Sequence, residues 1–144
     1  MIVQPSILVV EDDELDVIAL QRAFKRAGLT EYTTHLAKDG REALSMLKGE
    51  EGHAAIPLPN VVLMDINMPR MNGHECLEAI RNDPQLSHLV VFFMTTSTDV
   101  VDIRQAYARQ VAGYIVKSQR FAQFEQMAEM IKQYLELVVS PASA

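Results

Sequence analysis

ILVVEDD, residues 7–13, is an apolar run that ends on three consecutive acids. The same pattern recurs in VVLMD, residues 61–65, where Asp65 follows four apolar residues. A third apolar run, YIV at residues 114–116, is followed by Lys117. Short apolar runs are typical of parallel strands with two buried faces, and the carboxyl ends of such strands lie along one edge of the sheet. We therefore expect these acids and Lys117 to lie close together at that edge.

Strand patterns and helix patterns alternate along the rest of the chain. The expected strands are Ile7–Val10, Tyr32–Leu36, Val61–Met64, Leu89–Met94 and Gly113–Val116. The expected helices are about Asp13–Ala27, one that begins near Asp39, about Gly73–Arg81, one that begins near Thr98 with Thr98 or Asp99 as its cap, and about Phe121–Val139. The alternation predicts an α/β fold, a flavodoxin-like (βα)5 three-layer sandwich with a five-stranded parallel sheet in the order 2-1-3-4-5. The polar run at 32–36 is expected at a sheet edge, and Gly49–Asn60 is expected to be an exposed loop.

Length, charge and cysteine content exclude several classes of protein. The 144 residues lie in the range of one domain, 1–144, with a core at about 5–139 and a frayed tail at 140–144. The formal net charge of −6 argues against nonspecific binding of nucleic acid. Cys76 is the only cysteine, so no internal disulfide is possible and a cytoplasmic location is expected. The sequence shows no signal peptide and no apolar run that could cross a membrane.

Clustered carboxylates at a sheet edge require a cation, because two unit charges about 4 Å apart interact by roughly 4 kcal/mol at an effective dielectric of 20. Oxygen ligands favour a hard divalent cation, so Mg²⁺ (or Mn²⁺) is expected. Zinc is not expected, since the cysteine and the four histidines show no ligand spacing. The histidines are expected at the surface, at His35, His53, His74 and His88.

Four segments together resemble the receiver domain of response regulators, the phosphoacceptor half of two-component signalling. They are ILVVEDD at 7–13, LMDINMPRMNG at 63–73, MTT at 94–96 and GYIVK at 113–117, and they occur in order at family-like spacing. The resemblance implies that Asp65 accepts a phosphoryl group from a sensor histidine kinase. Apart from its own phosphorylation and dephosphorylation, no enzymatic activity is implied. A carboxylate suits this role because it is a nucleophile that forms an acyl phosphate.

The resemblance also implies the metal ligands. Asp12 and Asp65 match direct Mg²⁺ ligands, and Glu11 matches a ligand that acts through water. The backbone carbonyl of Asn67 matches a further protein ligand, with water and phosphoryl oxygens completing an octahedron. Asp13 follows the metal-binding pair and is expected to start the first helix, where its charge favours the helix dipole.

Three further residues match the catalytic and switch positions of the family. Lys117 is expected to reach Asp65 as a point charge for the phosphoryl oxygens. Thr95 matches the hydroxyl that bonds a phosphoryl oxygen, and Tyr114 matches an aromatic ring that turns inward when this hydroxyl moves. Alone, Tyr114 would be a half-buried aromatic residue that never moves, but its pairing with Thr95 favours the switch.

Two adjoining apolar rows on the last expected helix indicate a wide apolar face. We expect a symmetric homodimer through the fourth helix, fifth strand and fifth helix. The alternative is a monomer in which this broad stripe packs on the sheet. The expected interface residues are Val100, Ile103, Tyr107, Phe121, Phe124, Met127, Ile131 and Tyr134.

Two features depart from the common family pattern. Ser118 stands where the family usually has a proline after a cis bond, and a cis bond before a non-proline residue costs about 2.5–4 kcal/mol, so this loop is trans or strained. The Gly49–Asn60 loop is longer than in many receivers. With Thr95-Thr96-Ser97 and the last helix, these features resemble the stand-alone receivers paired with bacterial and cyanobacterial phytochromes. That resemblance implies a bacteriophytochrome as the kinase.

We expect no output domain, because the sequence contains no helix-turn-helix and no basic recognition helix. The protein would therefore bind another protein or pass its phosphoryl group to a histidine phosphotransferase, with no nucleic-acid or membrane partner.

The first alternative function is a receiver-like module that works without phosphorylation. A second alternative is an aspartate-nucleophile phosphatase of the haloacid-dehalogenase type, but it would need an Asp-x-Asp pattern after the first strand, which EDDE at 11–14 lacks. A third is a flavodoxin-like FMN carrier, but it would need a neutral phosphate loop at the same place.

Overall fold

A computed structural model describes residues 5–117 and 120–141, without the side chains of residues 120–122. The strands are β1 (Ser6–Val10), β2 (Thr33–Ala37), β3 (Val61–Met64), β4 (Val91–Thr95) and β5 (Gly113–Val116). The helices are α1 (Glu14–Ala27), the short 3-10 helix η1 (Leu29–Glu31), α2 (Gly40–Lys48), α3 (Gly73–Asn82), α4 (Val100–Ala108) and α5 (Arg120–Leu137).

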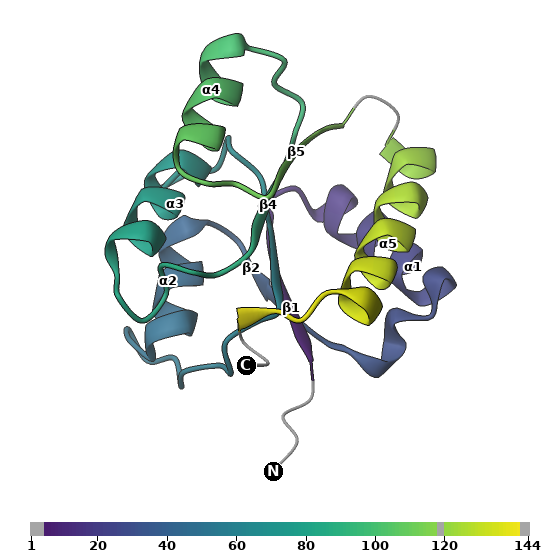
Figure 1. Cartoon of the computed structure of the whole chain (residues 1–144), viewed down its shortest axis with the longest axis horizontal. Coiled ribbons are helices and arrows are strands. Elements are labelled where there is room, and N and C mark those ends of the chain that lie inside the picture. The colour runs from purple at the N-terminus through teal and green to yellow at the C-terminus, as the bar shows by residue number, and fades with distance from the viewer. Residues whose placement is uncertain (1–4, 118–119, 142–144) are drawn as a thin grey trace.

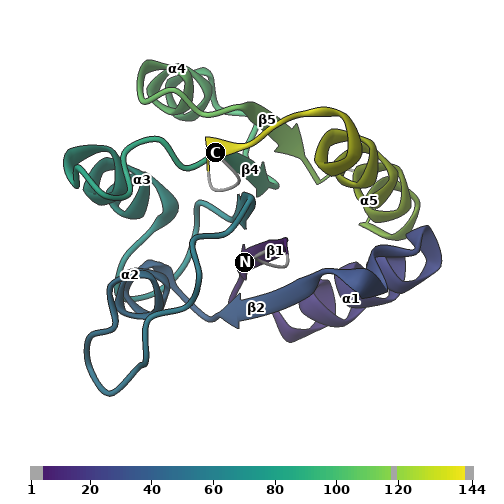
Figure 2. The same cartoon turned by 60° about the horizontal axis from the view of Figure 1, so that its bottom comes forward.

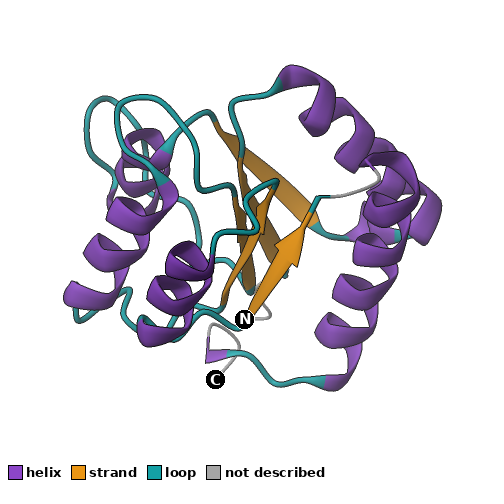
Figure 3. Cartoon of the chain, turned by 90° about the horizontal axis from the view of Figure 1, so that it is seen from above, coloured by secondary structure: helices purple, strands orange, loops and turns teal. Residues whose placement is uncertain are grey.

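The five strands form one parallel sheet in the order β2-β1-β3-β4-β5. This confirms the flavodoxin-like prediction, including the polar second strand at the edge. Figure 1 shows α1 and α5 on one side of the sheet and α2, α3 and α4 on the other. The view from above shows the same three layers, with the strands between two groups of helices (Figure 3).

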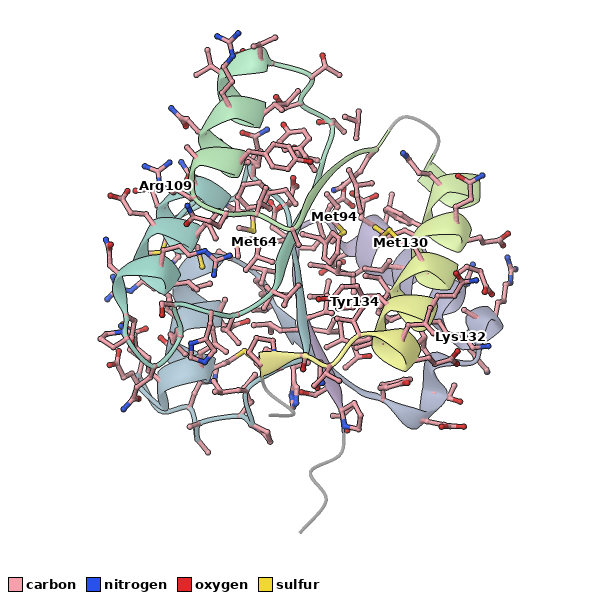
Figure 4. The ribbon with its side chains drawn as sticks, viewed as in Figure 1. Met64, Met94, Arg109, Met130, Lys132 and Tyr134 are labelled. Carbon is pink, nitrogen blue, oxygen red and sulfur yellow. The ribbon has the colours of Figure 1, made fainter. Side chains whose placement is uncertain are left out.

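Two hydrophobic clusters bury the two faces of the sheet. One cluster joins the sheet to α2, α3 and α4 and contains Met64, and the other joins the sheet to α1 and α5 and contains Met94. Figure 4 shows these two methionines on opposite sides of the strands. All four side chains of β3 are buried, since both of its faces are covered.

Local sequence chemistry fixes the ends of the helices that flank the sheet edge. Asp13 caps α1 by accepting hydrogen bonds from two backbone N–H groups of its first turn, as its position before the helix predicts. Gly28 ends α1 with a φ of 81°, a left-handed conformation that glycine adopts without steric cost. Asp99 rather than Thr98 caps α4, because its carboxylate accepts from the N–H of Val101.

The fourth strand begins two residues later than the sequence predicts. Leu89 donates its N–H to the carbonyl of Leu86 and so stays in the preceding turn. Thr95 joins the strand because it pairs with Val116 of β5. The strand therefore delivers Thr95 to the same sheet edge as the acids.

The ordered chain extends beyond the expected end of the core. Ser140, which the sequence analysis places in a frayed tail, is buried and accepts a hydrogen bond from the Asn60 side-chain amide at 2.8 Å. The Asn60 side chain also accepts from the Ser6 N–H at 3.1 Å. One buried side chain thus joins the start of β1 to the segment after α5, at the edge opposite the acids.

The expected dimer residues on α5 are in large part core residues. Phe124, Met127 and Ile131 are buried between α5 and the sheet, so they are not available to a second copy, and this part of the prediction is wrong. The physical reason is that this face of α5 packs against both α1 and the sheet, whereas Met130 and Leu137 of the second row stay exposed. Figure 2 shows α1 and α5 lying side by side.

The other expected dimer residues have different surroundings. Tyr134 is half-buried with its ring edge against Phe92. On α4, Val100 and Tyr107 are exposed and Ile103 is half-buried. The side chain of Phe121 and the peptide between Lys117 and Ser118 lie outside the described residues.

Candidate functional site

The carboxyl ends of β1 and β3 bring three acids together. Glu11, Asp12 and Asp65 each offer a carboxylate oxygen, and these oxygens lie within 4.8 Å of one another. The cause is the strand register, which pairs Val10 with Met64 and so sets the following residues side by side. Glu11 and Asp65 are buried, whereas Asp12 is exposed.

Asp65 is held in one orientation by the loop that follows it. Its N–H donates to the Val10 carbonyl at 3.0 Å, and its Oδ1 accepts from the Ile66 N–H at 2.7 Å. Its second carboxylate oxygen, Oδ2, faces Lys117. A Cβ atom on Gly73 would lie 2.4 Å from the Asp65 carbonyl oxygen, so this position requires glycine for close approach.

Lys117 reaches the acids from the end of β5. Its backbone N–H donates to the Thr95 carbonyl at 2.7 Å, which fixes the strand end. Its side chain is only 6% exposed, and its Nζ lies 2.7 Å from Glu11 Oε2 and 3.5 Å from Asp65 Oδ2. The structure therefore brings together Glu11, Asp12, Asp65 and Lys117, as the sequence predicts.

Asp16 is a member of this site that the sequence analysis missed. Its Oδ2 lies 2.9 Å from Lys117 Nζ, and its side chain is 6% exposed. The pattern contained a signal for it, because Asp16 stands four residues before Leu20 and so shares the buried face of α1. An acid on a buried helix face requires a partner, and Lys117 is one partner of Asp16.

Burial and the ion pairs change the ionisation of the site. Burial raises the pKa of Glu11 to about 7, against the lowering effect of the hydrogen bond from Lys117. Burial alone would lower the pKa of Lys117, but the hydrogen bond to Glu11 and the charges of Glu11 and Asp65 raise it. Lys117 is thus a firmly charged ammonium group, while Glu11 ionises near neutral pH.

The donor set suits a hard divalent cation. Among the residues that the structure describes, it consists of three carboxylates without a sulfur or nitrogen ligand, and one of them, Asp12, is open to solvent. Burial is the largest cause of the raised pKa of Glu11, and the negative charge of Asp65 raises it further. Asn67 lies in the loop after Asp65 with its side chain exposed.

A chain of hydrogen bonds leads from Thr95 to α4. The buried Thr95 Oγ1 accepts from the Ser97 N–H at 3.3 Å, and the Ser97 carbonyl accepts from the Tyr114 hydroxyl at 3.0 Å. The Ser97 hydroxyl donates to Asp102 of α4 at 2.6 Å. The Tyr114 ring lies edge to face against Phe93, at 6.3 Å between centroids, so the ring already faces the core.

His74 is a second residue whose environment the sequence analysis missed. It was expected at the surface, but its side chain is 13% exposed and its ring lies edge to face against Phe93. Its Nε2 lies 2.9 Å from Asp102 Oδ1. The hydrogen bond from Ser97 lowers the pKa of Asp102, burial opposes this effect, and the hydrogen bond from His74 lowers the pKa further. These contacts connect α3 to α4 next to Tyr114.

Comparison with known proteins identifies relatives of the whole chain. The family model of the response regulator receiver domain matches residues 7–131. The response regulator Rcp1 of Synechocystis sp. is 30% identical over 138 residues, which cover 95% of this chain and 93% of that protein. The probable methanogenesis regulatory protein FilR2 of Methanothrix harundinacea is 38% identical over 128 residues, covering 89% of this chain and 81% of that protein.

Solved structures give the same result. The phosphorylated cyanobacterial phytochrome response regulator RcpA superposes with a TM-score of 0.88 at 30% identity, covering 96% of this chain and 99% of that chain. The Mn²⁺-bound form of Rcp1 superposes with a TM-score of 0.81 at 29% identity, covering 95% of this chain and 99% of that chain. Within the described part of this chain, no helix is both long and apolar enough to cross a membrane.

Proposed function

Because the chain belongs to the response regulator receiver domain family, we propose that it accepts a phosphoryl group on Asp65 from a sensor histidine kinase in the cytoplasm. The observation that supports this most is the geometry of Asp65, with one carboxylate oxygen fixed by a backbone N–H and the other facing the Lys117 ammonium. In the transfer, an Asp65 oxygen forms a bond to phosphorus as the bond from phosphorus to the histidine nitrogen of the donor breaks.

Mg²⁺ (or Mn²⁺) would be held by Asp12, Asp65 and the Asn67 carbonyl, with Glu11 acting through water. When bound, the cation supplies positive charge that stabilises the transferring phosphoryl group. The Mn²⁺-bound form of the relative Rcp1 supports a divalent cation here. Lys117 contributes a second positive charge from the chain itself, next to Asp65.

The proposed output begins at Thr95. In this structure the Thr95 hydroxyl oxygen accepts a hydrogen bond from the Ser97 N–H. If the Thr95 side chain turns so that its hydroxyl donates to a phosphoryl oxygen, its oxygen moves, and the Ser97 N–H must shift with it. Ser97 also accepts a hydrogen bond from the Tyr114 hydroxyl and donates one to Asp102. A shift of Ser97 therefore changes the hydrogen bonds of both Tyr114 and Asp102. The signal would therefore reach the surface through the loop before α4 and not through movement of the Tyr114 ring alone.

The proposed kinase is of the phytochrome type. Support comes from the phytochrome response regulator RcpA, which is similar to this chain over nearly the full length of both proteins. A groove of about 380 Å³ runs between α1 and β2, from Glu11 and Asp12 past Ile18 to Leu36. Leu15 and Ile18 of α1 are 64% and 46% exposed, so α1 offers an apolar docking surface beside the phosphoacceptor.

The proposed output surface is α4, where a second copy or a downstream protein would bind. Val100 and Val101 are 55% and 58% exposed, and Tyr107 is 53% exposed, which leaves an apolar face on a helix that is joined to the switch by Ser97 and Asp102. We propose that a homodimer forms through α4 and not through the buried α5 residues Phe124, Met127 and Ile131. A histidine phosphotransferase would instead dock near Asp65.

Phosphotransfer profiling tests the proposed function. Histidine kinases of the phytochrome type, labelled on their phosphohistidine, are mixed with the wild-type protein and with Asp65→Asn. We expect label to move to the wild-type protein and to stay on the kinase with Asp65→Asn. Transfer to Asp65→Asn at the wild-type rate would overturn the assignment of Asp65.

A further inference from the structure

In the described part of the chain, Lys117 has three carboxylate partners, which match its three N–H donors. The two shortest contacts are with Glu11 at 2.7 Å and Asp16 at 2.9 Å, and the contact with Asp65 is the longest at 3.5 Å. The ammonium group is therefore held mainly by the two acids that are not the phosphoacceptor.

Asp16 differs from the other two partners in its position. Glu11 and Asp65 belong to the carboxylate cluster that would hold a divalent cation, and Asp16 is outside that cluster. Asp16 lies in the first turn of α1, where the helix dipole favours a negative charge, and its side chain is almost completely buried. It is thus the carboxylate that serves Lys117 without also serving the cation.

We propose that Asp16 is a positioning residue that draws the Lys117 ammonium toward α1 and so competes for it with the phosphoryl group on Asp65. This inference rests on the proposed function, because it concerns the same lysine. Lys117 Nζ lies 2.9 Å from Asp16 but 3.5 Å from Asp65, so Asp16 competes with the phosphoryl group for the position of this ammonium and lengthens its contact with that group. The phosphorylated state is then less stable than it would be without this acid.

Binding of beryllofluoride, a phosphoryl analogue, to Asp65 tests the inference. The affinity is measured by isothermal titration calorimetry at saturating Mg²⁺ for the wild type, Asp16→Asn and Asp16→Glu. We expect Asp16→Asn to bind about tenfold more tightly, the order of magnitude of one charge-assisted hydrogen bond. Asp16→Glu keeps the charge and should restore an affinity near that of the wild type.

Glu14→Gln is the matched control. It removes one negative charge from the same helix turn, beside Glu11 and Asp12, but the structure shows no contact between Glu14 and Lys117 among the described residues. We expect its affinity to lie within about twofold of the wild type. Equal tightening by Asp16→Asn and Glu14→Gln would assign the effect to net charge and overturn the inference. An unchanged or weakened affinity in Asp16→Asn would overturn it as well.

A crystal structure of the wild type with Mg²⁺ and beryllofluoride gives an independent test that does not depend on the folding of a variant. Lys117 Nζ should lie within hydrogen-bond distance of both a fluorine atom and Asp16. Loss of the contact with Asp16 would overturn the inference. If the wild type does not bind beryllofluoride at all, the proposed function of Asp65 fails first, so the two failures are distinguishable.

Discussion

Glu11 couples the stability of the metal-free protein to pH. Burial raises its pKa from the usual 4.5 to about 7. Between these two pH values, Glu11 of the folded protein holds a proton that the unfolded chain has lost. The free energy of unfolding therefore falls as the pH rises. In the presence of a chelator, we expect the contribution of Glu11 to fall as the pH rises from 4.5 to about 7, as measured by urea unfolding.

Glu11→Gln isolates this contribution, because it cannot ionise. The difference in unfolding free energy between the wild type and Glu11→Gln should change in favour of the variant as the pH rises through this range. A difference that is independent of pH would show that Glu11 has an ordinary pKa in the folded protein.

The loop between β4 and α4 transmits the proposed signal, and Thr95→Ala tests it. Beryllofluoride with Mg²⁺ should shift the backbone amide NMR signals of residues 97–107 in the wild type. Without the Thr95 hydroxyl, Ser97 has no reason to move, so these shifts should fall to less than about half while the signals next to Asp65 still change. Thr96→Ala, which removes an exposed hydroxyl one residue later, serves as the control and should behave as the wild type. Full shifts on α4 in Thr95→Ala would contradict this route.

Helix α1 is the proposed contact for the kinase. Leu15→Ser and Ile18→Ser should each slow phosphotransfer from a kinase found by profiling by about tenfold, since burying one such side chain contributes about 1.5–3 kcal/mol. Phosphorylation by acetyl phosphate should not change, because this small donor needs no docking surface. Gln21→Ser, an exposed polar position on the same helix, provides the comparison. Equal rates with the kinase for Leu15→Ser, Ile18→Ser and the wild type would rule out this surface.

The whole molecule would form its homodimer through helix α4. With beryllofluoride and Mg²⁺, light scattering should give twice the monomer mass for the wild type at high concentration, and the monomer mass for Val100→Asp, because a buried unpaired charge opposes association. Val139→Asp alters a valine that is 81% exposed on the segment after α5, and should still dimerise. Only monomer in every sample, with or without beryllofluoride, would remove the dimer from the account.

Much of the fold could be predicted because the patterns that define its strands and helix ends are local in the sequence. Apolar runs and helix caps gave the five strands, the sheet order and the meeting of Glu11, Asp65 and Lys117 at one edge. Receiver-like motifs then supplied residue roles that the spacing of residues alone does not define.

The errors concern residues whose surroundings depend on distant segments. Periodicity shows that Phe124 and Met127 lie on an apolar face, but not that α1 and the sheet together bury both of them. Asp16 was overlooked because its partner is 101 residues away, and Ser140 because Asn60 is 80 residues away. Such pairings depend on the packing of the complete fold, which a single sequence does not specify.

Phosphorylation by acetyl phosphate, followed by intact mass spectrometry, tests the central claim most directly. In the presence of Mg²⁺ we predict that the wild-type protein gains the mass of one phosphoryl group, that hydroxylamine removes it as expected for an acyl phosphate, and that Asp65→Asn gains none. A wild-type protein that remains unmodified would contradict the account and favour a receiver-like module that works without phosphorylation.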